Sequence, residues 1–263
     1  MRRSTALALT SRLTLIVLVC VSFAHTALAE TFESSTRQTT LLELFTSEGC
    51  SSCPPADAWL ADFKNSDQLW DRIVPVAFHV TYWDQYGWID PYGKAAYTQR
   101  QSDYVANWHK TSPYTPNFVR NGDNWQLWFR HPRPSPIEPE SVEAQAGPLT
   151  VDRNATNIDV IFRPANTPAS APVAHVAILA FGLSSQIKAG ENQGRQLNHE
   201  FVVIGHRQVT LKANGETFQA SLTSPETTDV DADRYALAAW VADPGDMHTL
   251  QATGGWLDHG LTR

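Results

Sequence analysis

Two cysteines, Cys50 and Cys53, stand three positions apart and form a C-x-x-C motif. A pair of thiols at this spacing is typical of thiol–disulfide exchange, in which one thiolate attacks and the other resolves the mixed disulfide. A disulfide that closes so short a loop removes little entropy from the unfolded chain, so it is a poor structural staple. We therefore expect Cys50 to be the nucleophile and Cys53 the resolving thiol of an oxidoreductase whose redox group is this disulfide.

The same cysteines also suit a soft metal ion, because thiolates select Cu(I) or zinc. His79, at the end of a predicted strand, is either a hydrogen-bonded structural residue or a third ligand, and no other group of histidine and cysteine in the sequence favours zinc. A Cu(I)-binding or copper-delivery protein that uses Cys50, Cys53 and His79 is one alternative to the oxidoreductase. The other is a non-catalytic protein-binding module in which the disulfide only fixes a loop.

The segments on either side of the motif predict a strand and a helix. Residues 41–46 are apolar and precede Gly49, a pattern typical of a buried strand. Proline is tolerated in the first turn of a helix, so Pro54-Pro55 fit a helix that begins there and places Cys53 near its N-cap. The cysteines then lie in the preceding loop, where the helix dipole activates Cys50 less strongly. The apolar face of this helix has the spacing i, i+3, i+4 and i+7, at Ala56, Trp59, Leu60 and Phe63.

Alternating strand and helix signals continue to about residue 130. Residues 73–80 are apolar and rich in β-branched types, which predicts a second buried strand, and residues 97–108 are compatible with a helix. The Asn121-Gly122 pair is a strong hairpin signal, for which residues 125–129 supply the expected partner strand.

Two loops in this stretch supply the expected substrate-binding residues. Trp83 and Asp84 would form a rim around the cysteines, in which Trp83 offers aromatic surface for a peptide and the Asp84 carboxylate modulates the pKa of the thiols. Alternatively, the tryptophans of this loop are buried in the core or at the interface with the β-rich module. Thr115-Pro116 follows the second helix. The order strand, C-x-x-C, helix, strand, helix, Thr-Pro and hairpin is that of the thioredoxin fold. In that fold this proline is cis and its loop holds the substrate backbone, a role we expect for Thr115 and Pro116. The alternative is an ordinary trans proline at the start of a strand.

Beyond a proline-rich stretch at 132–139, which is typical of a stiff linker, the sequence becomes strand-only. We expect an α/β protein with a thioredoxin-like domain over residues 30–140, followed by an all-β, sandwich-like module over 141–263 that packs on it. The β-rich runs of this module are 158–162, 173–183, 201–211, 217–222 and 235–241.

Four strings carry a resemblance to a known family. They are L-E-L-F-T-S-E-G-C-S-S-C-P-P-A-D at 42–57, F-H-V-T-Y-W-D-Q-Y-G-W-I-D-P at 78–91, Y-T-P-N at 114–117 and G-E-N-Q-G-R at 190–195. In these the chain resembles the exported thioredoxin-like proteins grouped as domain-of-unknown-function family 1223. The resemblance implies a thioredoxin-like fold and an exported location but supplies no activity. We expect the string at 190–195 to be a structural turn.

The N-terminus predicts export. Three arginines precede or flank an apolar run at 13–24, and Ala27-Leu28-Ala29 offers a cleavage site, so residues 1–29 are typical of a signal peptide. Cleavage removes Cys20 and the three arginines, which lowers the net charge from −7 to −10. An acidic chain lacks the positively charged surface that binds nucleic acid. We expect a periplasmic or secreted protein with no membrane span after cleavage, whose partner is a protein thiol or disulfide substrate or redox partner.

Overall fold

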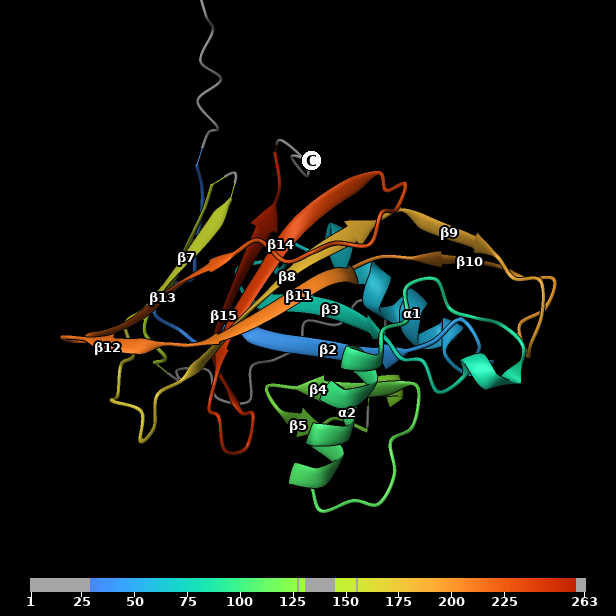
Figure 1. Ribbon diagram of the computed structural model, residues 1–263, viewed down its shortest axis with the longest axis horizontal. Helices are drawn as coiled ribbons and strands as arrows, with labels where there is room; N and C mark the ends of the chain where they lie inside the picture. The colour runs from blue at the N-terminus through green and yellow to red at the C-terminus, as the bar shows by residue number, and fades with distance from the viewer. Residues whose placement is uncertain (1–28, 127, 131–144, 155, 259–263) are drawn as a thin grey trace, which may run out of the picture.

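The computed structural model describes residues 29–126, 128–130, 145–154 and 156–258 of the chain (Figure 1). It is a mixed α/β structure made mostly of strands, and the described part holds two α-helices, α1 (Pro54–Ala61) and α2 (Ala95–Asn107). Residues 1–28 of the predicted signal peptide and the proline-rich stretch at 132–139 lie outside the described residues. Within those ranges, no helix is long and apolar enough to cross a membrane.

Eight strands form one mixed sheet in the order β15-β14-β8-β11-β3-β2-β4-β5. β3 pairs in parallel with β2 and with β11, whereas the other neighbouring strands pair antiparallel. β2 and β3 are buried along their whole length, as their continuous apolar runs predicted. The strands are β2 (Thr40–Thr46), β3 (Ile73–His79), β4 (Asn117–Arg120), β5 (Asp123–Asn124), β8 (Val173–Phe181), β11 (Val202–Thr210), β14 (Arg234–Ala242) and β15 (Thr249–Trp256).

A second sheet is antiparallel, with the order β1-β6-β7-β13-β12, and a separate pair of strands forms an arm. The five-stranded sheet consists of β1 (Glu30–Glu33), β6 (Leu149–Arg153), β7 (Asn157–Phe162), β12 (Lys212–Asn214) and β13 (Thr217–Thr223). The arm, β9 (Leu183–Gln186) and β10 (Gln196–His199), extends beyond the main sheet in Figure 1, and β10 contacts α1.

Strands from both halves of the chain meet in the eight-stranded sheet. β11, from the expected β-rich module, pairs with β3 of the expected first domain at Val202 and Ala77. The division into domains at 30–140 and 141–263 stays a prediction. The sequence did not indicate the shared sheet, because parallel pairing between distant segments leaves no local periodicity.

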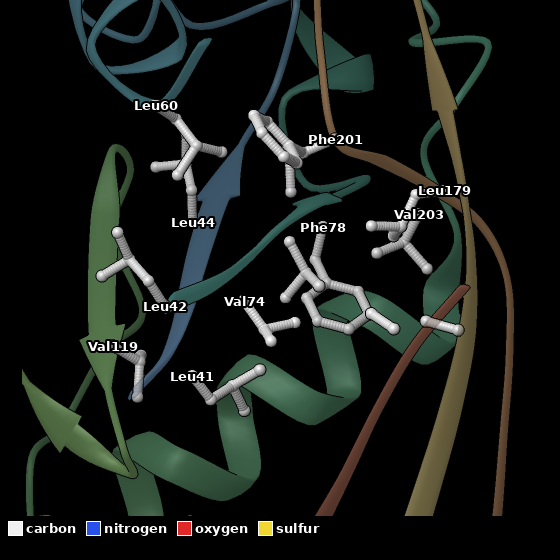
Figure 2. Close-up of a cluster of buried hydrophobic side chains, with 14 of the residues drawn as sticks. Leu41, Leu42, Leu44, Leu60, Val74, Phe78, Val119, Leu179, Phe201 and Val203 are labelled. Atoms are coloured by element: carbon white, nitrogen blue, oxygen red, sulfur yellow. The ribbon is translucent and has the colours of Figure 1, made fainter. Parts of the chain in front are cut away.

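The two helices cover opposite faces of the sheet around β2. Leu44 and Phe45 are successive residues of β2, so their side chains point to opposite faces. Phe118, the register partner of Leu44, stacks edge-on against Trp59 of α1 at a centroid distance of 5.2 Å. On the other face, the ring of Phe45 packs edge-on against the ring of Tyr104 of α2, with a centroid distance of 6.2 Å. Figure 2 shows the buried aliphatic and aromatic side chains that fill this region.

Alternation along β8 and β14 divides the core into two clusters. Every second residue joins the cluster around β2 and β3, and the intervening residues pack against the five-stranded sheet. The intervening residues are Ala174, Val176, Ile178 and Ala180 in β8 and Leu237, Ala239 and Val241 in β14, which meet Leu149, Val151, Ile158, Val160 and Phe162 of β6 and β7.

The Asn-Gly hairpin is confirmed, but its expected second strand at 125–129 is wrong. Asn121 and Gly122 both have positive φ, 49° and 100°, and join β4 to β5. The second strand is Asp123–Asn124, and Trp128–Arg130 forms a 3-10 turn. The ring of Trp125 contacts Trp59 of α1 at 5.6 Å, so packing on the helix replaces strand pairing here.

Candidate functional site

Cys50 and Cys53 are joined as a disulfide, with their Cα atoms 5.5 Å apart. Both cysteines are fully buried, whereas the intervening Ser51 and Ser52 are exposed. The hydroxyl of Ser52 lies 3.3 Å from Cys50 Sγ, within hydrogen-bond distance of sulfur. The motif is therefore a buried disulfide beneath the short exposed turn formed by Ser51 and Ser52.

The sequence around the motif explains its local structure. Cys53 is the N-cap of α1, as the two prolines predicted, and Pro54 and Pro55 take first-turn positions that need no N–H donor. The N–H groups of Ala56 and Asp57 bond the carbonyl of Cys53 at 2.8 and 3.1 Å. Cys50 accordingly lies in the loop that precedes the helix.

Trp83 and Thr115 come together at the motif. Gly49, next to Cys50, allows the close approach of Trp83, because a Cβ at Gly49 would lie 2.9 Å from Trp83 Cβ. The indole N–H of Trp83 donates to Thr115 Oγ1 at 2.7 Å. The Thr115–Pro116 peptide bond is cis, which confirms the expected geometry. Asp84 accepts a hydrogen bond from the N–H of Asp90 at 3.2 Å and so holds its own loop. The substrate-binding roles of these residues stay predictions.

The arm supplies two residues to the motif that the sequence did not single out. Asn192, fully buried, donates from Nδ2 to the carbonyls of Glu48 and Cys50 at 2.8 and 3.0 Å. Glu191 accepts a hydrogen bond from the N–H of Ser51 at 3.1 Å. The string at 190–195 is thus more than the structural turn we expected, because it covers the C-x-x-C loop.

A layer of buried carboxylates and imidazoles adjoins the motif. His79 Nδ1 and Asp90 Oδ2 are 2.8 Å apart, and His199 Nε2 and Glu48 Oε1 are 3.1 Å apart. The two imidazole rings are nearly perpendicular, with centroids 5.1 Å apart. In the described structure, Nε2 of His79 and Nδ1 of His199 are buried without a hydrogen-bond partner. These two ring nitrogens therefore keep hydrogen-bonding capacity that the layer itself does not use.

The charges of this layer follow from its pairing. Burial lowers the pKa of His79, but Asp90 together with Asp57 and Glu48 outweighs burial and leaves this pKa raised. Burial raises the pKa of Asp90, yet His79 together with the N–H groups of Glu48 and Tyr92 outweighs burial, so the pKa of Asp90 is lowered. His79 and Asp90 consequently form a buried ion pair.

Asp57 connects this layer to solvent. It lies one helical turn after Cys53, and Thr46 Oγ1 donates to its Oδ2 at 3.0 Å. Burial raises the pKa of Asp57, against the opposing effects of His199 and His79. With Pro54 and His199, Asp57 lines an open cleft of about 350 Å³ between α1 and the arm. The carboxyl group is thus placed to exchange protons with water.

The copper alternative would use the reduced cysteines, whereas the structure shows them joined as a disulfide. Among the residues that the structure describes, no three His, Cys, Asp or Glu side chains are grouped so as to hold a metal ion. Cys50 and Cys53 bond each other; Nδ1 of His79 is bonded to Asp90, whereas its Nε2 has no hydrogen-bond partner in the described structure. Copper binding by the reduced cysteines stays a prediction.

Comparison with known proteins gives a family and a fold. The sequence model described as "Protein of unknown function (DUF1223)" matches residues 41–242. Protein AGR_C_4864 from Agrobacterium tumefaciens is 18% identical with a TM-score of 0.55, over 87% of this chain and 98% of that one. HBP35 of Porphyromonas gingivalis is 14% identical with a TM-score of 0.53, over 86% and 77%. At these identities the similarity shows the fold alone. None of the curated proteins matches the chain.

Proposed function

We propose that this chain, which belongs to the DUF1223 family of proteins of unknown function, is an exported thiol–disulfide oxidoreductase. The observation that carries the proposal is the Cys50–Cys53 disulfide at the N-terminus of α1, with Cys53 as the N-cap. Its thioredoxin-like character is supported by the order β2, C-x-x-C, α1, β3, α2, cis Thr115–Pro116 and β4. The signal-like residues 1–29 support a periplasmic or secreted location.

The exchange runs in two balanced steps. The Cys50 thiolate attacks one sulfur of a substrate disulfide, a mixed disulfide forms, and the departing substrate thiolate takes a proton. The Cys53 thiolate then attacks Cys50 Sγ of the mixed disulfide and restores the Cys50–Cys53 bond. The second substrate sulfur leaves as a thiolate and takes a proton. The substrate gains two electrons and two protons, the protein dithiol loses them, and the reverse sequence oxidises a substrate dithiol.

The buried position of Cys53 requires a group that accepts its proton. Asp57 lies on the turn of α1 next to Cys53 and lines the cleft, so we assign it the exchange of this proton with water. A carboxyl group whose pKa is raised by burial is better matched to a thiol than an ordinary aspartate is.

Exposed apolar side chains around the motif support a protein substrate. The described residues include four exposed large apolar side chains, and three of them, Tyr86, Ile89 and Tyr114, lie on the loops that carry Trp83 and Thr115. Ile89 is 75% exposed and Tyr86 58% exposed. The Trp83–Thr115 hydrogen bond joins these two loops, and exposed apolar side chains on adjoining loops favour binding of another chain.

The first test measures exchange with a peptide that carries a glutathione mixed disulfide, together with the reduction potential of the pair in glutathione buffers. The wild-type protein should have a defined potential and turn over the peptide. Cys50→Ser should abolish turnover, whereas Cys53→Ser, which keeps the nucleophile, should accumulate a covalent mixed disulfide. Wild-type turnover by Cys50→Ser would overturn the proposal, as would a folded wild-type protein without any exchange.

A further inference from the structure

The loop of the arm places a carboxylate against the first peptide unit of the C-x-x-C turn. Oε2 of Glu191 accepts the N–H of Ser51 at 3.1 Å, and this N–H belongs to the peptide bond that leaves Cys50. Hydrogen bonds from Ser51 lower the pKa of Glu191, so its carboxylate is charged at neutral pH. A fixed negative charge therefore lies beside the cysteine that must become a thiolate.

The position of Glu191 is held by buried contacts of its neighbours. Asn192 Nδ2 bonds the carbonyls of Glu48 and Cys50, and Arg195 Nη1 donates to Asn192 Oδ1 at 2.7 Å. On the other side of the loop, a Cβ at Gly190 would lie 3.3 Å from Trp88 Cβ, so the arm also packs against the loop at 84–90. Asn192 bonds the motif itself, so the backbone of the preceding residue, Glu191, is anchored beside the motif, where its carboxylate accepts the Ser51 N–H.

We propose that Glu191 is a positioning residue that makes the Cys50–Cys53 pair more reducing by opposing the charge of the Cys50 thiolate. The inference rests on the proposed redox function. A nearby negative charge disfavours a thiolate, and an N–H already bonded to a carboxylate is not available to a thiolate. The disulfide carries no charge, so Glu191 destabilises only the reduced, ionised state. Ser52, whose hydroxyl lies 3.3 Å from Cys50 Sγ, acts in the opposite direction.

Other charged groups around the motif set the background against which Glu191 acts. Glu48 and Asp57 add negative charge on the inner side, where His79, His199 and Asp90 face them. Arg195 adds a positive charge on the arm. Substitution of Glu191 alone leaves all of these groups in place. At each pH the variant and the wild type therefore differ only in the charge at position 191.

The test compares Glu191→Gln with wild type in glutathione buffers over a range of pH. Glutamine keeps an oxygen that accepts the Ser51 N–H and removes only the charge. We expect the titration midpoint of the Cys50 thiol, followed by thiolate absorbance, to fall. At pH above that midpoint, the dithiol/disulfide ratio should rise roughly threefold, a size typical of one exposed charge. For a two-electron couple this corresponds to about 14 mV towards a more oxidising potential.

The pH profile separates this role from a structural one. Below the titration midpoint both thiols are neutral, so the difference between Glu191→Gln and wild type should vanish there. Glu191→Asp, which keeps the charge, should stay closer to wild type than Glu191→Gln. Glu216→Gln, an exposed charge change in the β12–β13 turn, should leave the ratio unchanged.

A difference between Glu191→Gln and wild type that persists at all pH values, or no difference at any pH, would overturn the inference. In both cases the wild-type pair would still have a potential and turn over the peptide. Absence of exchange by the wild-type protein would instead overturn the proposed function.

Discussion

Two clusters of buried charge come from one short segment of the chain, and they differ in how their polar atoms are used. Glu43 lies in the middle of β2, and Glu48 follows the end of the strand; both are fully buried. Around Glu43, Arg100 donates through Nε and Nη2 at 2.6 and 3.0 Å, and the hydroxyl of Tyr104 donates as well. Around Glu48, two imidazoles each keep an unpartnered ring nitrogen in the described structure.

The histidines near the two clusters respond in opposite directions. Burial, together with the Arg100 guanidinium, lowers the pKa of His175 and that of His206, the latter to about 3. Next to the other cluster, Asp90 holds the pKa of His79 above its ordinary value despite burial. Burial and Arg100 thus favour neutral imidazoles near the Glu43 cluster, whereas Asp90 favours a charged His79 in the Glu48 layer. We therefore assign a structural role to the first cluster and, on the basis of the proposed redox function, a chemical role to the second.

The largest effect should come from breaking the Glu43 cluster. Arg100→Leu leaves the Glu43 carboxylate buried without its cation, which typically costs about 3–5 kcal/mol of unfolding free energy. Urea unfolding of the oxidised protein at neutral pH measures this loss. The dithiol/disulfide ratio in glutathione buffers should not change, because the cluster does not touch the motif.

The double variant Glu43→Leu/Arg100→Leu is the control for this prediction. Because it removes both charges, it should be closer to wild type in stability than Arg100→Leu is. A loss below about 1 kcal/mol in Arg100→Leu, or a changed redox ratio in either protein, would contradict the structural role.

A smaller effect with a pH signature should follow from Asp90→Asn. Loss of the hydrogen bond to charged His79 should lower the unfolding free energy by about 1.5–3 kcal/mol. Because the pKa of His79 is raised in the folded state, its stabilisation is complete below the ordinary value of 6.5 and is lost as the pH rises through the folded pKa. The difference between Asp90→Asn and wild type should therefore shrink on the alkaline side.

Urea unfolding on both sides of this pH window checks the Asp90 prediction. His79→Gln/Asp90→Asn should show a smaller combined loss than the sum of the two single variants, because the residues are in contact. A pH-independent difference between Asp90→Asn and wild type would argue against a charged His79.

The sequence predicted the parts of the site that depend on neighbouring residues. The apolar run before Cys50 and the prolines after Cys53 specify β2, the loop and the N-cap, because each acts through local backbone preferences. It did not predict the contact of Glu191 with Ser51, which joins residues 140 positions apart. Long-range contacts of this kind leave no periodic pattern, and a polar string between two glycines has the same composition as an ordinary turn.

The buried layer was missed for a related reason. The sequence leaves two roles open for His79, a hydrogen-bonded structural residue or a ligand in the copper alternative, because a histidine at a strand end shows nothing of its partner. Asp90 and His199 reach it only when the loop at 84–90 and the arm fold back over the end of β3. The apolar patterns that specified the strands carry no information about which polar side chains meet at their ends.

Asp57→Asn should change stability least. Unlike the preceding variants, it should raise the unfolding free energy. The pKa of Asp57 is raised in the folded state, so stability falls as the pH rises from the ordinary value of 3.8 through the folded pKa. Asparagine removes this cost, and Asp57→Asn should be slightly more stable than wild type at neutral pH and equal to it below 3.8. Resolution of the mixed disulfide should nevertheless slow by about tenfold to a hundredfold, because Cys53 loses its proton acceptor.

Two measurements on the same protein decide the Asp57 prediction. Urea unfolding gives the stability, and single-turnover release of a peptide thiol from the mixed disulfide gives the resolution rate. Asp67→Asn, an exposed acid beyond α1, should leave both unchanged. An Asp57→Asn protein that resolves the mixed disulfide at the wild-type rate would show that the proton leaves Cys53 by another route. The roles of Cys50 and Cys53 would stand, but the Glu48 layer would then be as structural as the Glu43 cluster.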